Sequence, residues 1–504
     1  MWWRTKRLIY VVAGEASGDA IGAKLIQALE KHSQGPFAYR GVGGPQMMKT
    51  GRFESLFPME ELSVMGLIEV IPKLFVFKRR IKDVVRDVEA SRPHAIVTID
   101  SKGFCFRVLD KLKGSETRRH AAVVHYVAPS NWAYKHKHSK TAQTSASLQH
   151  LMDRMLVLLP FEERLFNKGS SFSAFVGHPA VEDFLEKHSL FRPHALKPAN
   201  PKDPGFKSFP RNEWLDERLP LDVLSAQTHI FEEAMPNRQP RGDEYVICAF
   251  VGSRENEVNS TVHLVKDAIT SFVNNHDKSQ GNIHVVFPTV RSIAPILKDV
   301  LDGWSIPWTV EYDNDAKQKM IESSNVAVAV SGTVVIESVL AGLPTIVIYR
   351  ANRVTEMIAK LLARVRFVSL PNIMMERELI PELIFSQCTS ANLTTALQKM
   401  YKTASDNDGD NALLCAALSQ LAVWNRFDMH IIPRRASELA ADVVVEAMAI
   451  KETENQTASK STRDNDDDDD DDDDDIIKRR PPARSYRRND VHHEEDDDEG
   501  EEDK

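Results

Sequence analysis

Cysteine is scarce in this sequence, with four residues among 504, and no two of them form a CxxC pair. Scattered single cysteines, with no histidine at ligand spacing, indicate neither a disulfide framework nor a zinc site. The pattern is typical of a protein from a reducing compartment. The four are Cys105, Cys248, Cys388 and Cys415.

Long hydrophobic runs are also missing, because no stretch reaches the roughly 18 to 20 apolar residues that a membrane-spanning helix needs. The N-terminus, MWWRTKRL, runs into the first expected strand at about Leu8. That leaves no room for the apolar core and cleavage site of a secretory signal. We therefore expect neither a spanning helix nor a cleavable targeting segment.

Charge is distributed unevenly along the chain. Residues 451–504 contain 10 Lys and Arg against 23 Asp and Glu, including an unbroken run from Asp466 to Asp475. Subtracting this charge of −13 from the whole-chain value of −9 leaves the first 450 residues at +4. Such self-repulsion predicts a disordered acidic tail, and we expect no nucleic-acid partner for the mildly basic body.

Short β-branched runs alternate with helical periods in the first half, as in RLIYVVAG followed by DAIGAKLIQALEKH. A second set of apolar runs begins at EYVICAFVGSR and continues through NIHVVFPTV, NVAVAVSG and PTIVIYR. Continuous apolar strands separated by helices indicate parallel sheets covered by helices on both faces. The sequence therefore predicts an α/β protein with two doubly wound, Rossmann-like domains facing across a cleft.

The rest of the chain predicts a linker, a last helix and the tail. The centre of the linker is rich in proline, lysine and aspartate. The last helix places Leu439, Val443 and Ala447 on one stripe, so it must dock on a body already formed. The expected boundaries are 1–190 for the N-terminal domain, 191–243 for the linker, 244–425 for the C-terminal domain, 426–450 for the last helix and 451–504 for the tail.

The first loop, in VVAGEASGDA, leaves a strand and enters a helix across Gly14 and Gly18. The glycines are not in a GxGxxG pattern and no GK[ST] follows, so the usual dinucleotide and P-loop fingerprints are absent. Glu15 and Asp19 would repel a pyrophosphate, and they suit sugar hydroxyls or acid–base work better. In the structural alternative, Ser17 and Asp19 simply cap the helix.

A better phosphate site is predicted in VAVSGTVVIESVLAGLPTIVIYR. Ser331, Gly332 and Thr333 form a turn between a strand and a helix, where backbone amides and the helix dipole would meet a diphosphate. Glu337, one turn into that helix, would reach ribose hydroxyls. Arg254, at another strand end in FVGSRENEV, offers a fork of donors to phosphate oxygens, although it could equally be an ordinary surface arginine.

Asp100 ends a buried strand in VTIDSKGF. A carboxylate at the mouth of the first sheet can accept a proton from an incoming hydroxyl, and structural capping is the alternative. His125 and Tyr126, which end AAVVHY, are weaker candidates, since a histidine at a strand end is often only hydrogen-bonded.

One segment, LSVMGLIEVIPKLFVFKRRIKDVVR over residues 62–86, gathers apolar residues over 64–77 and then turns basic. Glu69, Pro72 and Lys73 prevent it from spanning a bilayer. Two interpretations are open. The segment is either buried core followed by a solvated basic helix, or a face that lies in the lipid interface with its cations against anionic headgroups.

Together these blocks resemble lipid A disaccharide synthase, an inverting glycosyltransferase of the two-domain GT-B type. The resemblance extends over nearly the whole body, with many motifs in one order. They are VVAGEASGDAIGAKLIQALE, GVGGPQM, MEELSVMGLIEVIPKL, VTIDSKGF, VHYVAPSNWAY, LVLLPFE, FVGHPAVED, GSRENEV, SGTVVIE and SLPNIMMERELIPELI.

The resemblance implies that a UDP-linked diacylglucosamine donates its sugar to 2,3-diacylglucosamine 1-phosphate, giving lipid A disaccharide 1-phosphate and UDP. It implies an essential Asp100, a functional Arg254, and Glu15 near the reacting sugars. The family's apolar insertion patch falls on residues 64–77. The implied nucleotide site consists of Ser331, Gly332, Thr333, Glu337, Asn372 and Arg377.

Inversion needs a base for the attacking hydroxyl and stabilisation of the departing diphosphate. We expect Asp100 to act as the base, and Arg254 and the turn at Ser331 to stabilise UDP. We expect no metal and no cofactor besides the UDP-sugar, because neither domain core offers a DxD pair or a His/Cys cluster. The expected partners are lipid-linked sugars and a membrane surface, with a homodimer as an allowed assembly. The expected location is peripheral, on the inner face of a bacterial-type or organellar (mitochondrial or plastid) membrane.

Three positions depart from the usual family pattern. Lys102 and Val251 each replace a proline, and Met375 with Glu376 replaces Ala-Gly before Arg377. Two alternatives therefore stay open. One is another UDP-sugar GT-B enzyme such as an epimerase, which gives no reason for the apolar basic segment. The other is a membrane-peripheral binding protein with impaired catalysis.

Overall fold

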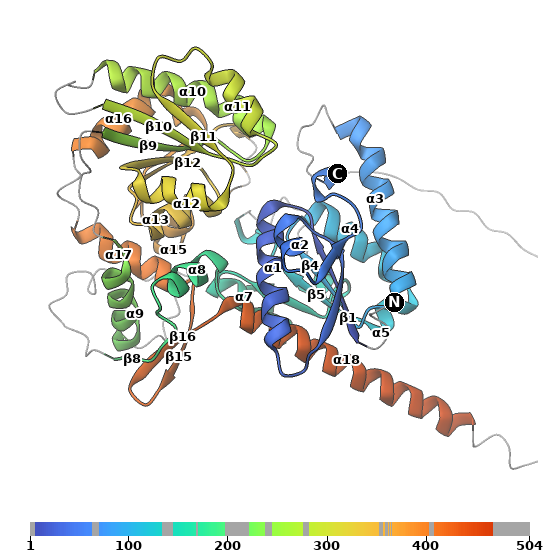
Figure 1. Ribbon diagram of the computed structural model, residues 1–504. Helices are drawn as coiled ribbons and strands as arrows, with labels where there is room; N and C mark the ends of the chain where they lie inside the picture. Colours follow the sequence, from blue (N-terminus) through green and yellow to red (C-terminus); the bar gives the residue numbers. More distant parts are fainter. Residues whose placement is uncertain are drawn as a thin grey trace, which may run out of the picture. The chain divides into compact units, whose positions relative to one another are not determined.

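The computed structural model divides into two compact units, Met1–Thr453 and Glu454–Lys504, and each is described by itself (Figure 1). Three predicted segments lie partly outside the described residues, namely the apolar segment at 63–69, the linker at 197–220 and 237–243, and the tail from 467 onward. The described residues are 6–62, 70–133, 145–167, 170–196, 221–236, 244–275, 282–351, 356–357, 361, 363, 365–402 and 408–466.

The first sheet contains seven parallel strands in the order β3-β2-β1-β4-β5-β6-β7. Its central strands are almost entirely buried, as expected for a sheet covered on both faces. The chain order reverses between β1 and β4, so the carboxyl ends of these strands form the topological switch point. The strands are β1 (Arg7–Ala13), β2 (Phe37–Val42), β3 (Phe53–Ser55), β4 (Ala95–Ile99), β5 (Ala122–Tyr126), β6 (Arg154–Val157) and β7 (Ser173–Phe175).

Helices cover both faces of this sheet (Figure 1). α1 (Ala16–Lys31) packs on one face through its buried aliphatic stripe. α3 (Val70–Ser91) and α4 (Lys102–Leu112) pack on the other. The remaining helices of this part are α2 (Pro45–Lys49), η2 (Met59–Leu62), α5 (Glu116–His120), η3 (Asn131–Ala133), α6 (Ser145–Gln149), α7 (Pro160–Asn167) and α8 (Pro179–Lys187).

The second sheet contains six parallel strands in the order β11-β10-β9-β12-β13-β14. Here the chain order reverses between β9 and β12, which gives a second switch point at their carboxyl ends. The strands are β9 (Glu244–Phe250), β10 (Asn282–Pro288), β11 (Trp308–Glu311), β12 (Val326–Val330), β13 (Thr345–Tyr349) and β14 (Glu382–Ile384). The predicted fold class, two Rossmann-like α/β domains, is confirmed.

The second sheet is also covered on both faces. One face packs against α10 (Glu255–Asn274), α11 (Ala294–Leu301) and α16 (Ser390–Lys402). A larger core lies on the other face and continues into the helices that follow the first sheet. Its helices are α9 (Leu221–Ala234), α12 (Asn314–Ser323), α13 (Thr333–Leu340), α15 (Leu370–Met375) and α17 (Asp408–Ser419). A short 3-10 turn, η6 (Phe385–Gln387), follows β14 and has no buried residue.

A small antiparallel sheet joins segments that lie far apart in the sequence. β8 (His194–Ala195) pairs with β16 (His430–Arg434), which pairs with β15 (Val423–Phe427). The chain then enters α18 (Ala436–Asp466). The first turn of this helix is fixed by Ser437, whose backbone amide and hydroxyl donate to the buried Glu182 carboxylate at 2.8 and 2.6 Å.

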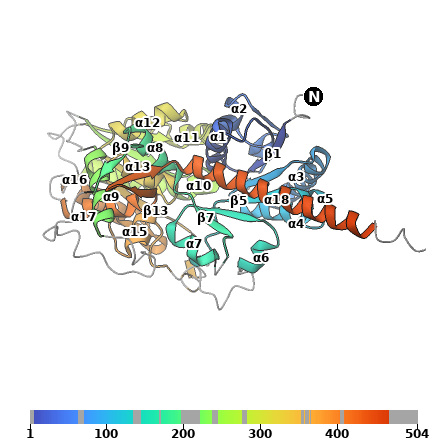
Figure 2. The ribbon, with the colours of Figure 1, turned by 90° about the horizontal axis from the view of Figure 1, so that it is seen from below.

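α18 brings the chain back to the first sheet. Ala440, Val444 and Met448 are buried in the same core as α1 and the strands β1 and β4. Of the predicted stripe, Ala447 is buried, whereas Leu439 and Val443 are half-buried at its edge. Figure 2 shows the part of this helix up to Thr453 lying against the first sheet. The helix also continues to Asp466, beyond the expected end at residue 450.

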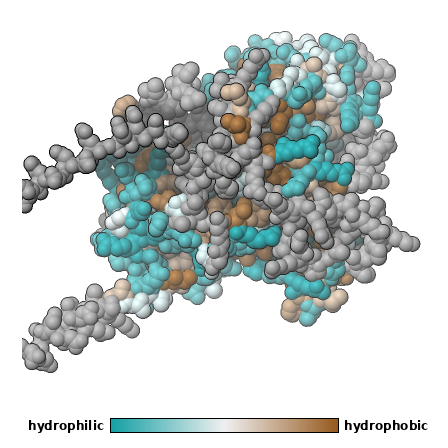
Figure 3. Space-filling model, turned by 180° about the vertical axis from the view of Figure 1, so that it is seen from behind, coloured by the Kyte–Doolittle hydropathy of each residue, from teal (hydrophilic) through white to brown (hydrophobic). Residues whose placement is uncertain are grey.

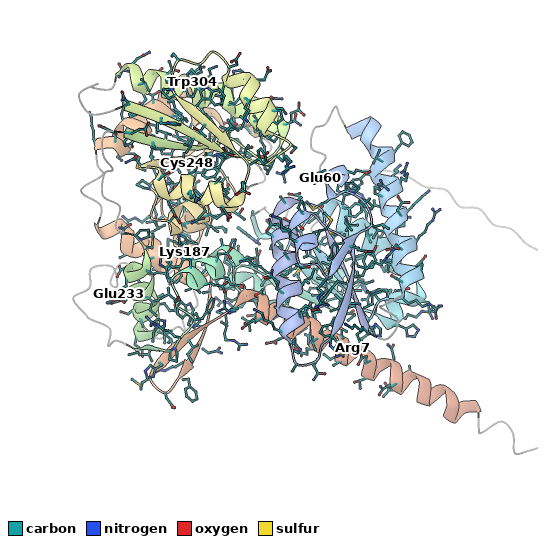
Figure 4. The ribbon with its side chains drawn as sticks, in the orientation of Figure 1. Arg7, Glu60, Lys187, Glu233, Cys248 and Trp304 are labelled. Carbon is teal, nitrogen blue, oxygen red and sulfur yellow. The ribbon has the colours of Figure 1, made fainter. Side chains whose placement is uncertain are left out.

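All four cysteines are free and buried. One of them, Cys248, lies among the core side chains of the second sheet (Figure 4). Hydrophilic and hydrophobic residues are intermixed on the described surface seen in Figure 3. Among the helices that the structure describes, none combines the length and the apolar character that a membrane span requires.

Candidate active site

Two loops meet at the switch point of the first sheet. One follows β1 and carries Glu15, and the other follows β4 and carries Asp100 and Ser101. They approach so closely that a Cβ atom at Gly14 would lie 2.4 Å from the Ser101 hydroxyl oxygen. Gly14 is therefore required by this approach, and it lets the two loops, each with one predicted carboxylate, lie against each other.

The backbone beside Asp100 is strained. Asp100 and Ser101 have φ angles of 49° and 44°, and Val127, after the neighbouring strand β5, has a φ of 77°. This left-handed region is uncommon for residues other than glycine, and most of all for a β-branched one. The Asp100 amide donates to the Tyr126 carbonyl at 2.9 Å, and the Val127 amide to the Leu156 carbonyl at 3.0 Å. Strain gathered at the carboxyl edge of a sheet is typical of functional sites.

The environment of Asp100 disfavours its charged form. Burial raises the pKa of Asp100, while the Ser101 backbone amide, the Arg254 guanidinium and the Lys102 ammonium lower it, and the net direction is upward. A carboxylate with a raised pKa accepts a proton more readily than an ordinary surface aspartate. That property suits a general base.

Arg254 connects the two switch points. Its Nη2 donates to Glu15 Oε2 at 2.5 Å, and its Nη1 donates to Glu257 Oε1 at 2.7 Å. Burial raises the pKa of Glu15, Arg254 lowers it and Asp100 raises it, with a net upward direction. For Arg254, burial lowers the pKa but Glu15 and Glu257 raise it above its usual value, so the guanidinium stays charged. The structure thus brings together the three predicted catalytic residues, Asp100, Glu15 and Arg254.

The loop after β9 is shaped around Glu257. Its Oε2 accepts the Ser253 amide at 3.0 Å, while its Oε1 binds Arg254. Gly252 has a φ of 120°, and a Cβ atom there would lie 2.5 Å from Glu257 Cβ. Glu257 therefore fixes both the backbone of this loop and the direction of its arginine. The sequence did not mark Glu257, because the N-cap is Arg254 and no Ser or Thr stands three residues before Glu257 as in a capping box.

The turn after β12 offers open backbone at the second switch point. Ser331 is anchored, with its amide donating to the Ile348 carbonyl and its hydroxyl to the Val368 carbonyl, each at 3.3 Å. Gly332 is the N-cap of α13 and makes no side-chain cap, and a Cβ atom there would meet nothing within 4 Å. Thr333 is the first residue of the helix. An uncapped helix start beside open space suits an anionic group.

Glu337 lies one turn into α13 and forms an ion pair with Lys317 of α12. Both side chains are about one quarter exposed, at 29% and 26% respectively. The sequence predicted Glu337 beside ribose hydroxyls. The partner Lys317 adds a constraint on the carboxylate that the sequence did not indicate.

Asn372 differs from the other predicted nucleotide residues, because its side chain has no exposed surface. Its Nδ2 donates to the Ile380 carbonyl at 2.7 Å and to Glu382 Oε1 at 2.9 Å, and its Oδ1 accepts the Leu379 and Ile380 amides. The amide therefore organises the loop that carries the exposed Arg377. Glu382, which sequence reasoning missed, completes this network.

Glu382 fixes the start of α15. Its Oε2 accepts the Val368 amide at 2.9 Å, and its Oε1 accepts the Ser369 amide at 2.9 Å and the Ser369 hydroxyl at 2.6 Å. Because the Ser331 hydroxyl donates to the Val368 carbonyl, the turn after β12 is tied to the same network. Glu382 lies on the edge strand β14, more than ten residues along the chain from the α15 N-terminus, so no local spacing marks this pair.

Three weaker candidates have internal partners. Asp19 is buried and accepts the amides of Gly44, Gln46 and Met47 at 2.8 to 3.0 Å, so it caps α2 rather than its own helix α1. His125 is buried, its Nδ1 lies 2.8 Å from the Thr98 hydroxyl, and burial lowers its pKa to about 3. Tyr126 is buried in the core of the first sheet.

Exposed apolar and basic side chains lie together on α3 and the start of α4. Phe75 is 76% exposed and Val76 is 39% exposed. The next residue, Phe77, packs edge-on against Phe104 of α4 with ring centroids 5.3 Å apart. The guanidinium carbon of Arg107 lies 5.7 Å from the Phe77 ring centroid. At this point of the segment 62–86, apolar side chains are therefore not all core.

Within the part of the chain that the structure describes, we find no group of three His, Cys, Asp or Glu side chains arranged to hold a metal ion.

The comparisons with known proteins agree on one family. The family model for lipid-A-disaccharide synthetase matches residues 9–199 and 228–422. The chain is 32% identical to the lipid-A-disaccharide synthase of Granulibacter bethesdensis, over 86% of this chain and 97% of that protein. It is also 32% identical to a probable mitochondrial lipid-A-disaccharide synthase of Arabidopsis thaliana, over 78% of each chain.

A solved structure supports the fold. The S. aureus MnaA–UDP co-structure covers 82% of this chain and 92% of that chain, with a TM-score of 0.50 and 11% sequence identity. At this level of identity the likeness concerns the arrangement of the two Rossmann-like sheets.

Proposed function

The chain belongs to the lipid-A-disaccharide synthase family, and we propose that it transfers a diacylglucosamine unit from UDP to 2,3-diacylglucosamine 1-phosphate. Membership makes it a GT-B glycosyltransferase that forms the lipid A disaccharide. The products would be lipid A disaccharide 1-phosphate and UDP.

One observation carries the assignment of residues to this reaction, namely the contact between the two switch points. Arg254 of the second sheet lies against Glu15 of the first, and Asp100 stands in the adjacent loop. In open α/β sheets, ligands bind beyond the carboxyl ends of the strands at such points. We assign the donor to the second switch point and the acceptor to the first.

Asp100 is the proposed base. It would take the proton from the acceptor's primary hydroxyl as that oxygen attacks the anomeric carbon from the face opposite UDP, which inverts the configuration. Its raised pKa and strained backbone support this role. Glu15, one loop away, would hold sugar hydroxyls and orient Arg254.

The departing UDP needs positive charge. Arg254 would bind the diphosphate through its fork of donors, and the amides at Gly332 and Thr333 would bind it at the start of α13. The bonds to Glu15 and Glu257 use two of the five N–H donors of Arg254, so the remaining donors would be available to the diphosphate. Glu337 would accept ribose hydroxyls, and Arg377 would lie near the nucleotide. Asn372 would position the loop rather than touch the ligand.

We propose that no metal takes part, since protein groups would balance the charge on the diphosphate. We also propose that the enzyme is peripheral, held at the inner face of a bacterial-type or organellar membrane through residues 64–77. The exposed Phe75 and Val76 support this location. A homodimer is an allowed assembly, and its test is the mass of the protein in detergent solution.

The experiment that tests the function is transfer of radiolabelled sugar from the UDP derivative to the lipid acceptor in detergent micelles. We expect a labelled disaccharide lipid and one equivalent of UDP, with the same rate after treatment with EDTA. A rate that falls with EDTA and returns with Mg²⁺ would contradict the metal-free proposal alone. No transfer to any lipid sugar would contradict the function and favour a binding protein or an epimerase.

A further inference from the structure

The start of α4 carries positive charge that the mechanism has not used. Lys102 is the first residue of α4 and follows Asp100 by two positions, so their Cα atoms lie at most about 7 Å apart. Among the described residues, the Lys102 side chain makes no hydrogen bond or ion pair, and it is exposed. Burial lowers the pKa of Lys102 and the nearby Asp100 carboxylate raises it. Since no hydrogen bond holds the ammonium group, it is available for a ligand.

A second cation lies at the same turn. Arg107 is exposed, and its Nη1 donates back to the Gly103 carbonyl, which brings the guanidinium to the first turn of α4, at the residue that follows Lys102. A Cβ atom at Gly103 would meet only this Nη1, at 3.6 Å, so the space over the glycine is otherwise open. Ser101, the N-cap, makes no side-chain cap, so the positive end of the helix dipole adds to the two side chains.

The surroundings indicate which anion belongs there. On one side stands Asp100, and on the other the Arg107 guanidinium contacts the Phe77 ring, next to the exposed Phe75 and Val76. A ligand spanning this strip would present a hydroxyl to the carboxylate, an anionic group to the two cations and apolar chains to α3. A phosphorylated, acylated sugar has these three parts in this order.

We propose that Lys102 and Arg107 bind the phosphate group of the lipid sugar acceptor, between Asp100 and the exposed apolar end of α3. This inference rests on the proposed function, which supplies a phosphorylated acceptor. Arginine gives the phosphate a planar pair of donors, and lysine gives it a compact charge. Lys102 stands where a proline is usual in the family, so on this chain the site has a charge that a proline cannot provide.

The bound phosphate would also affect the base. Lys102 and Arg254 help to keep Asp100 in its charged form, against the effect of burial. A phosphate beside Lys102 would offset that positive charge. Asp100 would then become a stronger base when the acceptor is in place, so binding and proton transfer would be coupled.

Steady-state kinetics with two acceptors tests the site. The enzyme is assayed in detergent micelles with 2,3-diacylglucosamine 1-phosphate and with the same lipid lacking the phosphate. We expect Lys102→Gln to raise KM for the phosphorylated acceptor about 10-fold, as for loss of a charge-assisted hydrogen bond, and Arg107→Gln to do the same. KM for the donor and KM for the lipid without phosphate should stay unchanged. Arg107→Lys, which keeps the charge, should restore part of the loss.

The matched control is Lys111→Gln, an exposed lysine in the last turn of the same helix, which should leave every constant unchanged. Equal losses with both acceptors, or none with either, would overturn the proposal. Vesicles of phosphatidylglycerol separate a membrane headgroup from the acceptor. If Lys102→Gln weakens vesicle binding but leaves KM in micelles unchanged, the cations contact headgroups and the proposal is wrong. If the unaltered enzyme transfers sugar to neither lipid, the proposed function itself fails.

Discussion

At the scale of single residues, the site contains three carboxylates and one guanidinium in direct or near contact. Glu15 and Glu257 both bind Arg254, and Asp100 stands beside them with a raised pKa. The three carboxylates therefore have different roles. Two of them hold the arginine, whereas Asp100 has its amide fixed by Tyr126 and its carboxylate free of any side-chain hydrogen bond among the described residues.

The first prediction concerns Asp100→Asn. The amide keeps the size of the side chain but cannot accept the hydroxyl proton, so turnover should fall about 100- to 10,000-fold. Binding of UDP, measured by isothermal titration calorimetry, should be retained because the donor lies on the other sheet. Unaltered turnover would remove the assignment of the base.

The pH dependence of kcat/KM is the second prediction. A base works only when unprotonated, and burial raises the pKa of Asp100. Activity should therefore be lost as the pH falls, with a midpoint above the usual range of an aspartate. Glu15, whose pKa burial also raises, would steepen this acid limb. In the Glu15→Gln variant, kcat/KM should still fall at low pH, with the slope of a single titrating group. A fall centred on the ordinary pKa of aspartate would contradict the assignment.

The third prediction concerns Glu257→Gln. The substitution weakens the hydrogen bonds that Glu257 accepts from Arg254 and from the Ser253 amide. KM for the UDP-sugar should therefore rise about 10-fold. KM for the acceptor should not change. Glu255→Gln, an exposed glutamate in the first turn of the same helix, is the control. A lower donor KM would mean that Glu257 repels the diphosphate instead of positioning the arginine.

At the scale of elements, the loops after the strands decide the function. The apolar runs were sufficient to predict the central strands of both sheets and their parallel pairing, because such runs bounded by helical periods have few other solutions. The edge strands and the order of the strands were not predicted. The sequence also predicted Asp100, Arg254 and Ser331 at strand ends. The two sheets have a topological switch point each, and these residues occupy those points.

Other features depended on contacts between distant segments. Nothing near Asn372 in the sequence indicates that its amide bonds to Ile380 and Glu382, so its buried role was not predictable. The position of Asp19 near the start of α1 suggested that it caps this helix, but its carboxylate instead accepts the Gly44 amide. Pairings of this kind require the fold, since local spacing carries no information on them.

The fourth prediction concerns the start of α18. Ser437→Ala removes the hydroxyl hydrogen bond to the buried Glu182 carboxylate and leaves the bond from the backbone amide in place. The loss should cost about 1 to 3 kcal/mol of stability, measured by urea unfolding. Glu182→Gln should cost a similar amount. Because both substitutions affect the same hydroxyl–carboxylate bond, the double variant should cost less than the sum of the single variants. Strict additivity would show that the contact contributes little.

At the scale of the whole molecule, the family places a lipid reaction on a protein without a spanning helix among its described residues. At the proposed peripheral location, the enzyme would reach its lipid substrates from the membrane surface. The exposed Phe75 and Val76, followed by the basic residues of α3, are suited to that approach. Residues 63–69, which carry the rest of the predicted patch, lie outside the described part of the chain.

The fifth prediction concerns binding to liposomes. Phe75→Ser combined with Val76→Ser should shift the protein from the liposome pellet to the supernatant, with roughly a 100-fold loss of partition if both side chains insert. Circular dichroism should remain unchanged, since these side chains are exposed. Phe427→Ser replaces another exposed aromatic residue, on the β15–β16 hairpin, and should have no effect. Unchanged partition of the double variant would exclude this face.

The return of α18 to the first sheet has a consequence for biosynthesis. The helix that covers one face of β1 and β4 leaves the ribosome only after the entire second sheet has been made. At roughly 5 to 20 residues per second, the nascent N-terminal half would wait on the order of tens of seconds with the apolar face of β1 and β4 uncovered by α18. During this interval it would depend on chaperones, and a stop codon shortly before Ala436 would leave it permanently prone to aggregate, although every proposed active-site residue would be present.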